Sequence, residues 1–331
     1  MSRTLGVVIG SNCFTGSHFV DALLQDPAYE VVGISRSPEQ GALFAPYRQR
    51  DMSRWTFYQI DLVRQAEAVQ TLLDELQPAC VINVAALSEV ALSNTSPVEY
   101  FETNTVGVVR LANFLRTRPY LKRYLHISSA EVYGSCEHPV AEDAPLRPST
   151  PYAVSKAAAD LYLSTLVNNF GFPAFIVRST NVYGKHQQLF KIIPRTILAI
   201  KQGKKVPLHG GGRAIKSFVH VRDVVQGALA AMRRGTPGTV YHFSTADDRT
   251  IAEVVRTVAR LMGRTFEDVA EPAAERLGQD ARYWLDATRA QRELGWRAHV
   301  DFEAGVRETI AWVEDHSEPI LQEALEYVHR V

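Results

Sequence analysis

Tyr152 and Lys156 are the residues of this sequence whose types and spacing suggest chemistry most directly. They lie four residues apart in "PYAVSKAAADLY", where Pro151 is a favoured first helical residue and Thr150 a suitable N-cap. A helix that begins there places both side chains on one face. A free phenol has a pKa of about 10, and a nearby ammonium favours the phenolate. The pair therefore predicts a general base, although any amphipathic helix can carry Tyr and Lys by chance.

A second group of polar side chains follows the apolar run "RYLHISS", which ends with Ser128 and Ser129. A serine hydroxyl at such a strand end could hydrogen-bond a substrate oxygen beside the phenol. Glu131 follows in "SSAEVYG" and is a candidate base for another proton transfer. The alternative for Glu131 is a solvated loop carboxylate or a partner in an ion pair. We expect Ser129, Glu131, Tyr152 and Lys156 to form the catalytic set.

Two glycines in "VVIGSNCFTGSHFV" predict a turn that leaves a strand and opens a helix, as a dinucleotide pyrophosphate requires. Cys13 stands where the middle glycine of such a turn is expected, and two glycines alone are not specific. The position of the turn in the first strand–helix unit supports the interpretation. The predicted cofactor contacts in the turn are Gly10, Asn12, Phe14, Thr15 and Gly16.

The end of the second predicted strand, "GISRSPE", bears on which dinucleotide binds. An NAD site usually presents Asp or Glu here to the ribose 2′-hydroxyl, whereas Ser35, Arg36 and Ser37 suit a 2′-phosphate. The sequence therefore favours NADP, with NAD as the alternative and an exposed loop arginine as the non-functional interpretation. The other predicted cofactor contacts are Asp61 and Leu62 near the adenine, the small Ala85 and Ala86 along the sheet edge, and Ser88, Asn104, Ser128, Tyr152 and Lys156.

These residues require a scaffold of alternating strands and helices, and the first half of the chain has that pattern. Continuous apolar strands separated by amphipathic helices predict a parallel sheet that is covered on both faces and doubly wound, the Rossmann arrangement. The expected strands are 4–10, 30–35, 57–62, 79–86, 123–129 and 174–180, and the expected helices are 16–25, 64–76, 97–116 and 151–169.

The second half lacks this regular alternation. Loops rich in Gly, Lys and Pro interrupt it, one strand is expected at 239–244, and helices are expected at 251–262, 287–294 and 303–329. We therefore expect a dinucleotide-binding domain over 1–180, with return segments near 218–245, and a smaller α/β lobe formed mainly by 181–331.

Composition excludes several classes of protein. The chain has 331 residues with 36 basic and 36 acidic side chains, so it offers no electrostatic footprint for nucleic acid or an anionic membrane. Three cysteines without C-x-x-C spacing fit a reducing cytoplasm. The N-terminal apolar run is too short for a membrane span, and no histidine spacing predicts a metal site.

With these motifs in view, the sequence resembles the extended short-chain dehydrogenase/reductase family, in its nucleotide-sugar epimerase/dehydratase branch. The resemblance runs nearly end to end and includes "NTVGVVRL", "RSTNVYG", "GGGRAIKSFVHVRDV" and "RYWLDATRAQRELGW". It implies a sugar-nucleotide substrate and a homodimer built through a four-helix seam. The substrate contacts that it implies are Asn181, Lys191, Lys216 and Arg282, the last two toward the pyrophosphate.

Glu131 decides which reaction the resemblance implies. Family members that eliminate water carry Glu at this position, whereas C4 epimerases have a small or hydroxylated residue. The implied activity is a 4,6-dehydratase with a tightly bound cofactor that is regenerated in each cycle. Ala130 departs from the Asp-Glu of thymidine-type enzymes and is closer to the GDP-mannose type, while "KHQQLFKIIPR" is closer to the thymidine type. The open alternatives are a 4-epimerase, a 4-ketoreductase, a dehydratase of other regiochemistry, and an NADP-binding sensor without activity.

Overall fold

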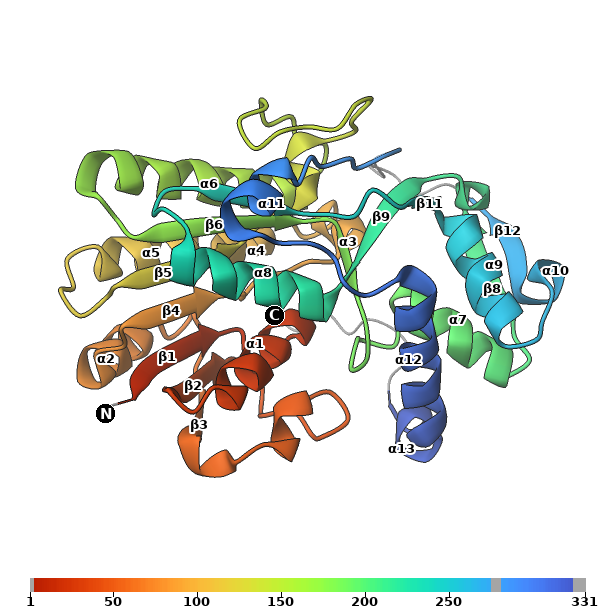
Figure 1. The fold of residues 1–331 in the computed structure, drawn as a ribbon, viewed down its shortest axis with the longest axis horizontal. Coiled ribbons are helices and arrows are strands. Elements are labelled where there is room, and N and C mark those ends of the chain that lie inside the picture. The colour runs from red at the N-terminus through yellow and green to blue at the C-terminus, as the bar shows by residue number, and fades with distance from the viewer. Residues whose placement is uncertain (1–2, 275–280, 324–331) are drawn as a thin grey trace.

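A seven-stranded parallel sheet forms the centre of the molecule in the computed structural model, which describes residues 3–274 and 281–323 (Figure 1). The strand order is β10-β6-β5-β4-β1-β2-β3, and every neighbouring pair is parallel. The strands are β1 (Thr4–Ile9), β2 (Tyr29–Ser35), β3 (Trp55–Gln59), β4 (Cys80–Asn83), β5 (Arg123–Ile127), β6 (Ala174–Ser179) and β10 (Val240–Phe243). The predicted doubly wound α/β fold is thus confirmed.

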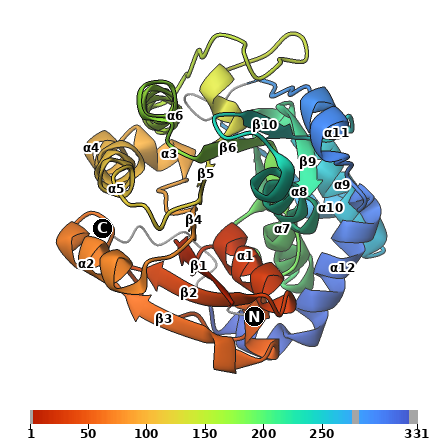
Figure 2. The ribbon, with the colours of Figure 1, turned by 60° about the vertical axis from the view of Figure 1, so that its left-hand side comes forward.

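Two layers of helices cover the sheet, one on each face (Figure 2). One layer contains α2 (Ala66–Leu76), α4 (Pro97–Phe101), α5 (Gly107–Leu115) and α6 (Pro151–Phe170), and the other contains α1 (Phe14–Gln25), α8 (Val221–Arg234) and α11 (Thr288–Leu294). The burial of strand β1 on both faces explains its apolar sequence. Val7 and Ile9 belong to the core beneath α2, α5 and α6, whereas Val8 belongs to the core beneath α1 and α8. A strand buried on both faces has no polar alternation.

The remaining elements form a smaller region beside the carboxyl ends of the strands (Figure 1). A three-stranded sheet has the order β11-β9-β7, and a two-stranded sheet pairs β12 with β8. The elements are β7 (Asn181–Tyr183), α7 (Ile192–Lys201), β8 (Val206–His209), β9 (Ile215–His220), β11 (Asp248–Thr250), α9 (Ile251–Leu261), α10 (Phe266–Val269), β12 (Ala270–Ala273), α12 (Phe302–Asp315) and α13 (Ser317–Leu321). Short helical turns complete the chain: η1 (Pro46–Gln49), η2 (Met52–Arg54), α3 (Val90–Ser93), η4 (Ala130–Tyr133) and η5 (Gly210–Gly212).

Several element boundaries differ from the predictions. The helix expected over 97–116 contains a π-helical turn, η3 (Glu102–Val106), between α4 and α5. The helix expected over 303–329 ends at Asp315, α13 follows it, and residues 324–331 lie outside the described residues. Helices α7 and α8 were not predicted, although Val221, Val224 and Ala228 of α8 have helical spacing and are buried.

Candidate functional site

The candidate site lies where the chain order of the sheet reverses, between β1 and β4. Ligands of open parallel sheets bind at the carboxyl ends of the strands at this point. Gly10 follows β1 with a φ of +89°, and a Cβ on it would lie 2.6 Å from the backbone nitrogen of Ala85, which follows β4. Only glycine accommodates both that backbone conformation and that close approach.

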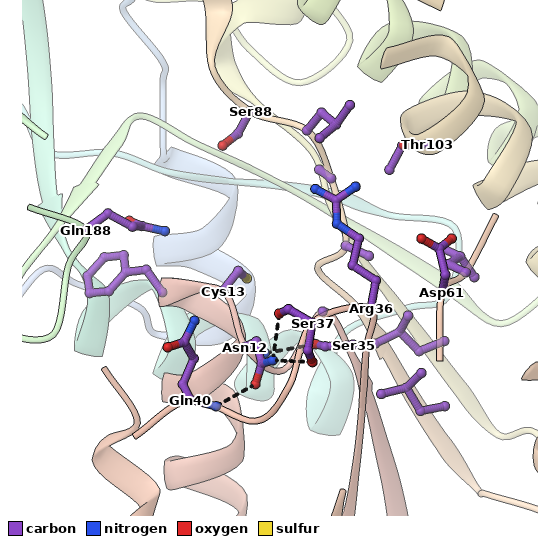
Figure 3. Close-up of a pocket in the computed structure, with 18 of the residues that line it drawn as sticks. Asn12, Cys13, Ser35, Arg36, Ser37, Gln40, Asp61, Ser88, Thr103 and Gln188 are labelled. Atoms are coloured by element: carbon purple, nitrogen blue, oxygen red, sulfur yellow. Dashed lines mark hydrogen bonds between the residues drawn. The ribbon is translucent and has the colours of Figure 1, made fainter. Parts of the chain in front are cut away.

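A cavity of about 410 Å³ opens at this reversal (Figure 3). Most of the predicted cofactor contacts line it: Gly10, Asn12, Phe14, Ser35, Arg36, Ser37, Asp61, Leu62, Ala85, Ala86 and Ser88. Sequence reasoning missed other lining residues, among them Cys13, Gln40, Phe44 and Thr103, whose only sequence signal is their nearness to predicted elements. His186 and Gln188 also line this cavity, whereas buried Gln187 donates to the Val182 carbonyl at 2.8 Å.

The turn between β1 and α1 fits a dinucleotide pyrophosphate. A Cβ on Gly16 would collide with the Gly10 carbonyl oxygen, so glycine at this position lets the helix start close to the strand. Cys13 is the N-cap of α1, and its sulfur accepts a hydrogen bond from the Gly16 backbone N–H at 3.2 Å. Burial raises the pKa of the Cys13 thiol to about 11, so it stays neutral and does not repel an anion at the helix N-terminus.

The end of β2 presents hydroxyl, amide and guanidinium groups to the cavity (Figure 3). Ser35 Oγ accepts from the Asn12 backbone N–H at 3.0 Å, and the Asn12 amide donates to Ser37 Oγ at 3.0 Å. The exposed Arg36 side chain extends along the same wall. Among the described residues, the carboxylates that line the cavity are Asp61, Glu99, Glu102 and Glu323, and β2 ends without one. This end of the cavity therefore offers a cation and hydroxyl groups, and no carboxylate from β2, to the ribose of a dinucleotide.

Ser129, Glu131 and Tyr152 meet near the carboxyl end of β5. Ser129 is the N-cap of η4, and its hydroxyl accepts from the Glu131 backbone N–H at 3.2 Å. The Ser129 side chain also hydrogen-bonds to Tyr152. The Glu131 carboxylate is half-buried, its Oε2 atom is shielded from solvent, and its charge acts on the Tyr152 phenol. The carboxylate is thus near enough for its charge to act on the phenol, and one of its oxygens is shielded from water.

Tyr152 and Lys156 lie on α6, and the helix begins as predicted, with the Thr150 hydroxyl capping the Ala153 N–H at 3.2 Å. Lys156 is almost fully buried, and its ammonium donates to the Ile127 carbonyl at 2.7 Å. Burial lowers the pKa of Lys156 to about 8, whereas burial and the Glu131 charge raise the pKa of Tyr152. The expected lowering of the Tyr152 pKa is therefore absent in the protein alone, because desolvation and the Glu131 charge outweigh the opposing hydrogen bond from Ser129.

The other predicted cofactor contacts are not among the residues that line the cavity: Thr15, Gly16, Asn104, Ser128, Tyr152 and Lys156. Asn104 accepts from the Leu87 N–H at 2.9 Å and donates to Ser155 Oγ at 3.0 Å, so its amide ties the loop after β4 to α6. Ser128 donates to Asp160 at 2.8 Å. Thr15, in the first turn of α1, is not among the lining residues. The structure thus gives Asn104 a positioning role, because its polar groups already bond to the protein.

The predicted substrate contacts lie on several elements of the smaller region. Lys216 of β9 is buried, with its ammonium 3.3 Å from the centre of the Tyr283 ring. Arg282 pairs with Asp248 at 2.5 Å and stacks on the Trp284 ring. A parallel bridge joins residues 215 and 282. Because successive side chains of a strand point to opposite faces, the bridge does not place the Lys216 and Arg282 side chains on one face.

Asn181 begins β7, the strand paired with β9, and Lys191 lies at the N-cap of α7. Within the described part of the chain, no group of three or more His, Cys, Asp or Glu residues could hold a metal ion. No helix among residues 3–274 and 281–323 is long and apolar enough to cross a bilayer.

The parallel sheet, the glycine turn and the Ser–Tyr–Lys arrangement define an extended short-chain dehydrogenase/reductase. The family model of GDP-mannose 4,6 dehydratase matches residues 7–309. The chain belongs to this family, whose members include nucleotide-sugar dehydratases.

Relatives and solved structures agree with this assignment. The dTDP-glucose 4,6-dehydratase of Streptomyces antibioticus is 33% identical over 317 residues, which cover 94% of this chain and 92% of the relative. The structure of the Streptomyces venezuelae dTDP-glucose 4,6-dehydratase with NAD bound has a TM-score of 0.88, at 30% identity, and the match covers 96% of this chain and 100% of that one. A UDP-glucose 4-epimerase from Thermus thermophilus, in complex with NAD, has a TM-score of 0.84 at 28% identity, covering 94% and 99% of the two chains.

Proposed function

We propose that this protein is an NADP-dependent nucleotide-sugar 4,6-dehydratase that converts a nucleotide-activated hexose to its 4-keto-6-deoxy derivative. The observation that carries the proposal is the placement of the Glu131 carboxylate beside Tyr152, with one oxygen shielded from solvent. A 4-epimerase needs the phenol and the serine but has no use for a second base at this position.

The reaction follows from what each side chain can do. The nicotinamide, when bound, supplies reversible hydride acceptance, taking the hydrogen of C4 and returning it to C6. Tyr152 would remove the proton of the C4 hydroxyl after it has itself lost a proton, which the positive charge of a bound nicotinamide would favour over the state in the protein alone. Ser129 would hold the resulting carbonyl oxygen. The new ketone makes the C5 hydrogen acidic, and Glu131 removes it as a proton.

One carboxylate then has to serve twice, because Ala130 cannot supply a second acid. Glu131 passes the proton taken from C5 to the departing C6 hydroxyl, which leaves as water. Solvent supplies the proton that later returns to C5, and Tyr152 releases its own proton.

The cofactor preference rests on the end of β2. Arg36 and the Ser35 and Ser37 hydroxyls offer a cation and hydrogen-bond donors to a 2′-phosphate. The structural relatives with bound cofactor hold NAD, so this chain would differ from them in the cofactor that it prefers. NAD remains the alternative cofactor for the same cavity.

The nucleotide diphosphate would lie near Lys216 and Arg282, and Arg282 would exchange its present partner Asp248 for the phosphate. Asn181 at the floor of the cleft and Lys191 at the start of α7 complete the proposed contacts. The named relatives act on dTDP-glucose, which makes thymidine diphosphate the first nucleotide to test and GDP the second.

We also propose a cytoplasmic homodimer. Two neighbouring helical segments expose large apolar side chains on one side of the molecule, namely Val98, Phe101 and Val106 together with Val154, Leu161 and Phe170. Packing such faces from two copies would form a four-helix seam. No disulfide joins the three cysteines in the described part of the chain, which fits a reducing compartment. Light scattering of the protein and of its Leu161→Glu variant tests the seam, because a carboxylate buried in the dimer interface should dissociate the dimer into monomers.

The experiment that tests the function offers the protein a panel of TDP-, GDP-, UDP- and CDP-hexoses. Mass spectrometry would follow the loss of one water, and the cofactor would be identified in protein denatured after purification. A dehydratase gives a product lighter by one water that carries solvent deuterium at C5 in heavy water. A change of configuration at C4 without loss of water would favour the epimerase, and no change with any sugar would favour the NADP-binding sensor.

A further inference from the structure

A buried ion pair joins the two elements that carry the proposed catalytic residues. Asp160 lies on α6, one helical turn after Lys156, and its Oδ2 accepts from Arg178 Nε at 2.9 Å and from Ser128 Oγ at 2.8 Å. Asp160 is 1% exposed and Arg178 4% exposed. The pair therefore connects the helix of Tyr152 and Lys156 to the ends of β5 and β6.

The other end of Arg178 reaches the turn that carries Glu131. Its Nη1 donates to the hydroxyl of Tyr133 and to the Glu142 carbonyl at 3.2 Å. Tyr133 lies two residues after Glu131 within η4, and its hydroxyl is also 2.7 Å from His242 Nε2 on β10. Side chains from two strands thus fix the position of a turn of only four residues.

Asp160 also faces the amine of Lys156 across a small group of charged and titratable side chains. His126 of β5 lies 3.4 Å from Lys156 Nζ and 3.9 Å from Asp160 Oδ1. Burial lowers the pKa of His126 well below its usual value, so the ring is neutral. Other groups near this cluster are Tyr152 on the same helix, Arg178 and the neutral Cys13 thiol. Asp160 is accordingly the nearby anion that favours the charged form of Lys156.

Stability alone does not explain such a pair. A buried ion pair is often no more stabilising than well-packed apolar residues of the same volume, because desolvation offsets the attraction. The contacts here instead lead in two directions, toward the lysine and toward the glutamate turn. That arrangement can hold the Lys156 and Glu131 side chains at a fixed separation.

We infer that Asp160 and Arg178 are positioning residues with separable effects. Asp160 maintains the charge of Lys156, which is used in sugar oxidation. Arg178 acts through Tyr133 to hold the turn that carries Glu131, which is used in water elimination. This inference rests on the proposed dehydratase function. Neither residue touches substrate or cofactor, and each acts through a neighbour.

Tyr133→Phe tests the branch toward Glu131, since it removes one hydroxyl and keeps the packed ring. Tyr241→Phe is the matched control: Tyr241 is a buried tyrosine of β10 whose hydroxyl donates to Glu293 at 3.1 Å, away from η4. In single turnovers we expect Tyr133→Phe to form reduced cofactor at the wild-type rate. Its rates of water loss and of deuterium uptake at C5 should fall about 10- to 100-fold. Tyr241→Phe should leave both steps unchanged, and thermal unfolding would report the stability of each variant.

Asp160→Asn tests the branch toward Lys156. The high-pH limb of cofactor reduction should move to lower pH by about one unit, because the lysine loses the anion that favours its charged form. Arg178→Lys keeps the charge opposite Asp160 but loses the planar fork, so it should leave that limb in place and slow elimination as Tyr133→Phe does. If Asp160→Asn does not fold, Asp160→Ser provides the same test, because it also removes the anion and the limb should again move to lower pH.

Coincident pH limbs in Asp160→Asn and wild type would overturn the first branch. The branch toward Glu131 would be overturned if Tyr133→Phe and Arg178→Lys slowed oxidation and elimination equally. It would also be overturned if these variants slowed neither step. If the wild-type protein itself neither reduces cofactor nor eliminates water, it is the proposed function that fails.

Discussion

The Lys191 ammonium lies 3.1 Å from the Glu89 carboxylate and links the start of α7 to the loop after β4. The Tyr100 hydroxyl donates to the Glu89 carbonyl at 2.5 Å and holds that loop in place. The Lys191 and Glu89 side chains keep 33% and 25% of their exposure, so this ion pair is worth less than about 1 kcal/mol. Lys191 can therefore leave Glu89 for an anionic substrate at little cost.

Competition between Glu89 and the substrate for Lys191 predicts opposite effects of two isosteric changes. Glu89→Gln should lower the KM for the sugar nucleotide about threefold, because the lysine no longer has a competing carboxylate. Lys191→Gln should raise the KM about tenfold through loss of a charge-assisted contact. Steady-state kinetics measures both values, and a KM that shifts in the same direction in both variants would show that the pair only supports the fold.

Glu131→Gln should separate oxidation from elimination. The amide cannot accept the C5 proton, so water loss should fall by about 10²- to 10⁴-fold, while reduced cofactor accumulates with a 4-keto sugar. Rapid mixing with optical detection of reduced nicotinamide, together with mass analysis of the sugar, measures the two steps. Glu137→Gln, the same change at an exposed glutamate six residues further along, is the matched control for this loop. Retained elimination in Glu131→Gln would remove the glutamate from the mechanism.

Arg36→Ala should weaken NADP binding about tenfold or more and leave NAD binding unchanged, since the guanidinium has a charged partner only in the 2′-phosphate. Titration calorimetry with each cofactor measures the two affinities. Arg64, which also lines the cavity but follows β3, provides the matched substitution Arg64→Ala. Equal losses for both cofactors after Arg36→Ala would assign Arg36 to the shared part of the dinucleotide.

The lowered pKa of Lys156 predicts a fall in the oxidation rate above pH 8, where its ammonium loses a proton. The stability effect has the opposite sign. The unfolded chain, with a lysine pKa of about 10.4, binds more protons than the native one between about pH 8 and 10, so this group stabilises the fold as pH rises. Single-turnover rates and thermal midpoints across this range test both statements. Lys156→Met should abolish the fall in oxidation rate above pH 8. If the fall persists in this variant, another group causes it.

Sequence patterns predicted the elements that depend on local rules. The N-cap at Thr150, the start of α6 at Pro151 and the buried strand before Ser128 follow from capping and burial on both faces, and the structure contains each of them. The Gly10 turn was recognisable for the same reason, because its positive φ excludes other residues. The family resemblance then supplied what spacing alone left open, such as the meaning of a glutamate at position 131.

Other features had no local signal. Asn104 resembles a site residue in sequence, but a π-helical turn directs its amide to Leu87 and Ser155. The contacts of Arg178 with Asp160 and Tyr133 span 18 and 45 residues, and no periodicity predicts such a meeting.

The sequence by itself determined the doubly wound fold, the helix that carries Tyr152 and Lys156, and the identity of the groups able to move protons. Those properties follow from backbone conformation and burial patterns that repeat every two to four residues. Only the tertiary structure decided that Glu131 lies beside Tyr152 and that burial, more than neighbouring charge, sets the pKa values of Tyr152 and Lys156. The reason is that desolvation depends on every segment that packs around a group, wherever that segment lies in the chain.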